Sequence, residues 1–140
     1  MLPRTFFLGR LIGLFLILAA LSMLMHKQSL VATVPRLIQD RPLLLFIGLI
    51  ASIAGLAMVL GHNVWAGGTL PVVVTLIGWT ILIRGLLLLF LSPETLAIFF
   101  EMLHFEDLFY VYAAISGVIG LYLTYAGFKA LPPLNEGTKR

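Results

Sequence analysis

Few side chains in this sequence could do chemistry, and the three histidines are the first to consider. His26 and His104 fall near one end of the apolar segments described below, whereas His62 falls near the other end. No two histidines have the three- or four-residue spacing that places two metal ligands on one helix face. The chain has no cysteine, which excludes thiolate metal sites, iron–sulfur clusters and disulfides. The sequence therefore predicts no bound metal, haem or other cofactor.

Hydroxyl nucleophiles are the next candidates. Ser22, Ser52 and Ser116 lie in apolar segments, and no His or Asp stands where it would activate one of them. The Gly-x-Ser-x-Gly turn of many hydrolases does not occur. Small hydroxylic residues in such segments more often serve helix packing. We therefore expect no enzymatic activity.

The elements that position these residues are long apolar helices. From Pro42 to Ile83 the chain runs for 42 residues without Lys, Arg, Asp or Glu, interrupted only by the polar stretch 61–68. About 20 apolar residues in a helix cross the hydrocarbon core of a bilayer, so this run predicts two spans joined by a turn. Hydrophobic residues make up 61% of the chain. The sequence predicts a single all-α membrane domain with four transmembrane helices, at about 6–25, 42–61, 70–91 and 108–128.

Arg84 is the one charged residue well inside a predicted span. It lies about seven residues before the end of the third span, or roughly 10 Å deep at 1.5 Å per residue. An arginine there costs a few kcal/mol unless it faces protein, water or the interface. One interpretation is a structural ion pair, with Glu94 or Glu101 as the preferred partner. The other is a site for an anionic lipid or ligand.

Two connections between spans predict short amphipathic helices at the membrane surface, at about 34–40 and 93–104. The second begins with a good helix-start order, Ser92-Pro93-Glu94. The order span, surface helix, span therefore occurs twice, which suggests two parallel repeats about an axis along the membrane normal. At an offset of 65 residues, identical residues align in the later spans: Ile50 with Ile115, Gly55 with Gly120 and Leu56 with Leu121.

Small residues predict which helices pack closely. Lipid supplies no hydrophobic drive between helices, so close approach over small side chains brings spans together. Such residues recur at four-residue spacing in the second and fourth predicted spans. We therefore expect these two spans to pack on each other at the bundle centre and the other two to face lipid. The residues are Gly48, Ser52, Gly55, Gly117 and Gly120.

The charges predict an orientation. The formal net charge of +3 is modest and indicates contact with the bilayer rather than with nucleic acid. Five basic residues lie on the side of the two termini, and three lie on the opposite side with most of the acids. The terminal side carries Arg4, Arg10, Lys129, Lys139 and Arg140, and the opposite side carries Lys27, Arg36 and Arg41. Because Lys and Arg concentrate on the cytoplasmic side, we expect both termini there.

The turn between the second and third spans carries the most distinctive motif. The motif is Gly61 followed by His62, Asn63 and Trp65. Gly61 suits a helix end, Asn63 tolerates turn geometry, and Trp65 suits the membrane interface. The string Gly55–Trp65, followed by Val74–Trp79 and then Arg84 before Gly85, resembles a group of small uncharacterised bacterial integral membrane proteins. The resemblance implies four spans in a bacterial inner membrane, and it carries no activity or ligand.

Two functional hypotheses follow. The first is a non-enzymatic accessory or assembly subunit that works through helix packing with other membrane proteins or with itself. The second is a small transporter, or a lipid- or anion-binding protein, that uses Arg84. A polar cavity beside Arg84 would favour the second hypothesis, and a dry bundle with exposed apolar faces would favour the first.

Overall fold

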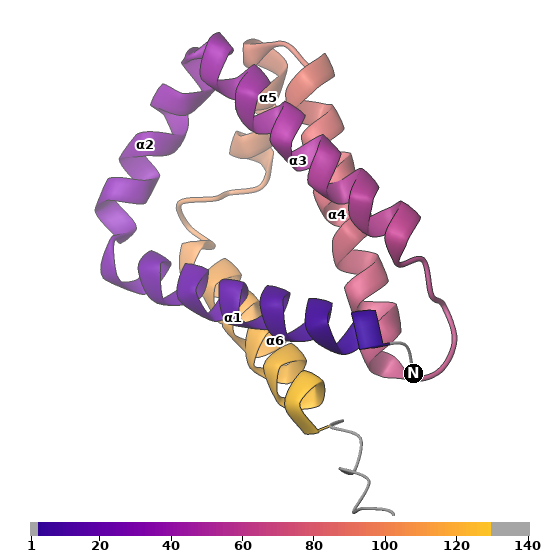
Figure 1. The fold of residues 1–140 in the computed structure, drawn as a ribbon. Coiled ribbons are helices and arrows are strands. Elements are labelled where there is room, and N and C mark those ends of the chain that lie inside the picture. Colours follow the sequence, from indigo (N-terminus) through magenta and orange to yellow (C-terminus); the bar gives the residue numbers. More distant parts are fainter. Residues whose placement is uncertain (1–2, 130–140) are drawn as a thin grey trace, which may run out of the picture.

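The structure is a computed structural model that describes residues 3–129 (Figure 1). This part of the chain contains six α-helices and no β-strand. They are α1 (Pro3–Met25), α2 (Lys27–Gln39), α3 (Arg41–Gly61), α4 (Thr69–Phe90), α5 (Pro93–Met102) and α6 (Phe109–Lys129).

Four of these helices, α1, α3, α4 and α6, are long and apolar enough to cross a membrane. Their bounds lie within three residues of the predicted spans, because the ends of the charge-free segments coincide with residues that stop or start a helix. Asp40 starts α3: its Oδ1 accepts a hydrogen bond from the Leu43 N–H at 3.1 Å. Before α4, Gly67 and Gly68 take positive φ angles of 94° and 122°, which glycine adopts without steric cost.

The short helices depart more from the prediction. The expected helix at 34–40 begins at Lys27 instead, and Pro35 lies inside it. The predicted start at residue 34 puts Pro35 in the first turn, where a proline is tolerated best. Continuous helix from Lys27 keeps Leu30 on the same side as Val34 and Ile38. The expected helix at 93–104 ends at Met102, just before His104, whose φ angle of 47° is left-handed.

The spans pack in two antiparallel pairs, α1 with α6 and α3 with α4. The predicted packing of the second span (α3) on the fourth (α6) through Gly55 and Gly120 is therefore wrong. Gly55 packs on Leu82 of α4, and Gly120 packs on Gly13 and Ile17 of α1. The expectation that the third span faces lipid is also wrong, because α4 buries more residues than any other helix (Leu70, Pro71, Val74, Thr75, Gly78 and Gly85).

The other predicted packing residues also lie at these two contacts. Gly48 faces Leu88 and Leu89 of α4, and a methyl group on Gly85 would meet Ser52. Gly117 faces Ala20 of α1. Small residues thus mark close helix contacts as expected, but the helix on the other side is different.

The two pairs contact each other mainly at one end of the molecule, which we call the turn end. It contains the start of α1, the 62–68 turn and the end of α6. Here Ile12, Leu70, Val74 and Leu123 form a buried cluster that joins α1, α4 and α6. At the opposite end, which we call the α2–α5 end, Ile38, Leu44 and Leu96 form a second cluster. This second cluster joins α2 and α5 to α3.

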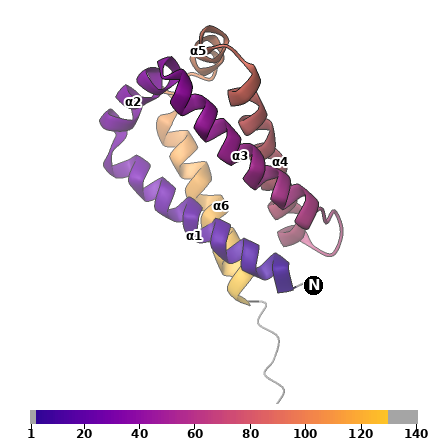
Figure 2. The same cartoon turned by 45° about the horizontal axis from the view of Figure 1, so that its top comes forward.

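Helix α2 separates the pairs at the α2–α5 end, as the two views in Figures 1 and 2 show. Its 13 residues run from the end of α1 to the start of α3. At 1.5 Å per residue, α2 holds these two helix ends about 20 Å apart. Directly packed helices lie about 8–10 Å apart. The pairs are therefore close at the turn end and apart at the α2–α5 end, and we call the space between them the seam.

Candidate functional site

Arg84 lies on the face of α4 that continues into the seam. It follows Ile77 by two helical turns and Val73 by three, and both of those residues pack against the cluster at the turn end. Arg84 itself is exposed. The seam therefore presents one cation on an otherwise apolar helix face.

The structure does not bring Arg84 to either predicted acidic partner. Among residues 3–129, no carboxylate oxygen lies within 4.0 Å of an arginine or lysine nitrogen. Glu94 and Glu101 lie on α5, and both border a cavity between α2 and α5 that Arg84 does not line. The predicted ion pair is therefore not formed.

Glu94 lies exposed in the first turn of α5. Its pKa is lowered, first by a hydrogen bond with the Ser92 side chain and then by hydrogen bonding with its own backbone. Arg41 adds a smaller attraction. Ser92 also caps α5, where its Oγ accepts a hydrogen bond from the Thr95 N–H at 3.3 Å.

The predicted turn motif is tied together by hydrogen bonds. The Trp65 Nε1 donates to Asn63 Oδ1 at 2.7 Å. The Thr75 hydroxyl accepts from the Val64 N–H at 3.1 Å and lies 3.1 Å from the Val64 carbonyl oxygen, to which it donates. These bonds fasten the turn to the first part of α4, so most of this motif serves structure.

His62 is buried in this turn, with 3% of its surface exposed. Its Nε2 atom has no hydrogen-bond partner in the described part of the chain. His104 bonds within its own turn, with Nδ1 lying 3.0 Å from the Met102 carbonyl oxygen. Over residues 3–129, no group of three or more His, Asp and Glu side chains is placed to hold a metal ion.

Two residues at the turn end were not singled out as site or packing residues. Thr75 is buried in α4 and makes the bonds described above, yet a threonine in an apolar helix has no distinctive pattern in sequence. Arg10 donates through Nε to the Gly127 carbonyl oxygen at 2.8 Å, and its guanidinium carbon lies 4.7 Å from the centre of the Phe128 ring. From the sequence, Arg10 counts only as one of the basic residues on the terminal side, and the structure shows that it also joins α1 to α6.

Comparison with known proteins adds no functional assignment. No family model, curated protein or solved structure matches this chain. The functional argument therefore depends on the geometry of the helices and on the few charged side chains near them.

Proposed function

We propose that this protein is a non-enzymatic accessory or assembly subunit that holds a membrane helix of a partner protein in the seam. The observation that carries this proposal is the spacing set by α2. A helix packed between two others at about 8–10 Å from each would separate them by roughly 16–20 Å. The length of α2 corresponds to about 20 Å. The spacing at the α2–α5 end thus suits one interposed helix.

The chemistry of the seam also supports a protein partner. Apolar side chains such as Ile77 and Ile81 line this face of α4, and Arg84 lies among them. Arg84 needs an acidic group, a polar group or water, because an unpaired charge within the bilayer is costly. A carboxylate on the partner helix would pair with it. Arg84 lines neither the cavity between α2 and α5 nor the one between α1 and α6.

A second candidate is an anionic-lipid-binding protein. The specific observation in its favour is that Arg84 is exposed and has no carboxylate partner among residues 3–129. A phospholipid phosphate between the helix pairs would satisfy the guanidinium with charge-assisted hydrogen bonds.

We also propose that the chain consists of two parallel repeats, with α1, α2 and α3 equivalent to α4, α5 and α6. Contacts related by the offset of 65 residues support this proposal. Gly55 packs on Leu82, and the equivalent Gly120 packs on Ile17. In the same way, the contact of Gly85 with Ser52 is equivalent to that of Gly117 with Ala20. A pseudo-twofold axis between α1 and α4 would relate the two helix pairs.

A bacterial inner membrane with both termini in the cytoplasm remains our proposed setting. Four spanning helices place both termini on one side, and the basic residues near them favour the cytoplasm. The resemblance of residues 55–85 to small bacterial membrane proteins supports the same setting.

Photo-crosslinking in native membranes tests the function. Benzoylphenylalanine at Ile81 would face the seam, whereas the same residue at Ile83, two positions along α4, would face away from it. We expect Ile81 to give one discrete protein adduct and Ile83 to give none. Lipid adducts alone at both positions would contradict the accessory role. If the Ile81 adduct is an anionic phospholipid and Arg84→Gln abolishes it, the second candidate is supported instead.

A further inference from the structure

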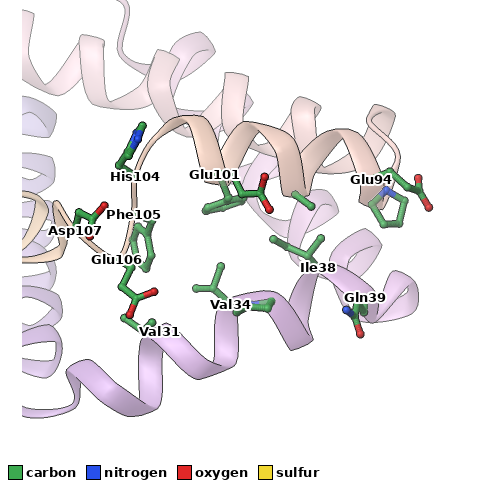
Figure 3. Close-up of a pocket in the computed structure, with 14 residues that line it drawn as sticks. Val31, Val34, Ile38, Gln39, Glu94, Glu101, His104, Phe105, Glu106 and Asp107 are labelled. Carbon is green, nitrogen blue, oxygen red and sulfur yellow. The ribbon is translucent and has the colours of Figure 1, made fainter.

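A cavity of about 690 Å³ lies between α2 and α5 at the α2–α5 end (Figure 3). Its volume falls within the range of about 300–1,000 Å³ typical of small-molecule sites. The loop that follows α5 closes one side of it. This cavity is separate from the seam residues used above.

The walls of the cavity are apolar and partly aromatic. Val31, Val34 and Ile38 line it from α2, and Phe100 and Phe105 line it from α5 and the following loop. The two phenylalanine rings meet edge to face, with their centres 6.2 Å apart. Phe105 also stacks on Tyr112, at 5.9 Å between ring centres. The aromatic wall is therefore fixed by packing outside the cavity.

The carboxylates that line the cavity give it a negative charge. Four acidic residues line it (Glu94, Glu101, Glu106 and Asp107), and no Lys or Arg does. Figure 3 shows Glu106 extending from the loop toward Val31, and Glu94 at the opposite end of the cavity. The nearby Lys27 is engaged elsewhere, with its Nζ 4.5 Å from the centre of the Tyr110 ring.

We propose that this cavity binds a hydrophobic organic cation, such as a quaternary ammonium or phosphonium compound. Carboxylates attract the positive charge, and aromatic rings stabilise a cation that is only weakly hydrated. The apolar residues of α2 accommodate the body of the ligand. A metal ion is a poorer occupant, because the acidic side chains of the described region are not gathered closely enough to coordinate one.

Binding of tetraphenylphosphonium to the purified protein in nanodiscs of zwitterionic lipid tests this proposal. Tetraphenylborate has nearly the same shape and the opposite charge, so it is the matched ligand control. Equilibrium dialysis with empty nanodiscs subtracts partition into lipid. We expect saturable 1:1 binding of the cation, weakened by salt, and no saturable binding of the anion.

Variants locate the site. Glu101→Gln together with Glu106→Gln should weaken binding of the cation roughly three- to tenfold, as the loss of two partly exposed charges would. Asp40→Asn is the control, because it removes a carboxylate that does not line the cavity and keeps an oxygen that can accept from the Leu43 N–H. It should change the affinity by less than about twofold. Equal uptake by protein-loaded and empty nanodiscs, or equal binding of both ions, would overturn the proposal. Unchanged affinity in the double variant would also overturn it. None of these three outcomes depends on the crosslinking result at Ile81.

Discussion

The two helix pairs, α3 with α4 and α1 with α6, are held by the same kind of glycine contact. They differ in how far apart their two helices lie in the sequence. In α3 and α4, Gly55 and Gly85 allow the backbones to approach, and in α1 and α6, Gly13 and Gly120 do so. The first pair is joined by a short turn, and its Val64–Thr75 bond spans 11 residues. The second pair is joined through the rest of the protein, and its Arg10–Gly127 bond spans 117 residues. Close packing of two helices therefore does not require that they be neighbours in sequence.

The largest expected effect comes from filling the glycine contacts. Leucine at Gly55 or at Gly120 would push against the backbone of Leu82 or of Gly13, respectively. We expect each change to lower the free energy of unfolding by about 2–3 kcal/mol, the upper part of the range for overpacking. Equilibrium unfolding in mixed micelles measures this change in the free energy of unfolding. Gly61→Leu is the matched control, because a side chain at Gly61 would meet no atom within 4 Å. If Gly120→Leu behaved like Gly61→Leu, the two pairs would not share the same kind of contact.

A smaller effect is expected from a change that destabilises only the α3–α4 pair, whose helices are joined by the short turn. Thr75→Val keeps the shape of the side chain but leaves the Val64 N–H without its acceptor, so we expect a loss of about 1–2 kcal/mol. Thr80→Val is the control, since its hydroxyl bonds only to Leu76 of the same helix, at 2.8 Å. Cysteine crosslinking between α1 and α6 should be unchanged in both variants. Weakened α1–α6 crosslinking in Thr75→Val would show that the turn supports both pairs.

The smallest effect concerns the start of α5, in the connection between the two pairs. Because the folded state lowers the pKa of Glu94, its charge stabilises α5 above the ordinary carboxylate pKa. That contribution disappears as the pH falls through the lowered value. Ser92→Ala removes the largest cause of the shift, so the pKa should rise toward normal. It also removes the helix cap, at a cost of about 0.5–1 kcal/mol. Carboxyl NMR titration of Glu94 measures the first effect, and an unchanged pKa would contradict this account.

Sequence patterns predicted the spanning helices well because length and absence of charge determine them. The polar stretch 61–68 and the start of the charge-free run at Pro42 marked helix ends that the structure confirms. The start of α2 was predicted at residue 34 but lies at Lys27. A proline is most favourable in the first turn of a helix, so Pro35 indicated a start just before it. The start at Lys27 depends on packing that single-sequence patterns do not contain.

The choice of packing partner could not be predicted in the same way. Gly55 and Gly120 both indicate a close helix contact, but a glycine carries no information about which helix faces it. Choosing between α3–α6 contact and the observed pairs depends on the clusters at the two ends of the molecule. The cavity between α2 and α5 was missed for a related reason. In the sequence, Glu94 and Glu101 suggest partners for Arg84, and no pattern there places α2 beside α5.

The bond between Arg10 and Gly127 has a consequence for biosynthesis. When α1 first enters the membrane, the acceptor of Arg10 has not yet been translated, and residues up to 127 must leave the ribosome before the bond can form. During this interval α1 lacks its bond to α6, while α3 and α4 can already pack on each other. We therefore expect α1 to pack on α6 only after α3 and α4 have joined, so that the first helix to be made is among the last to reach its final contacts.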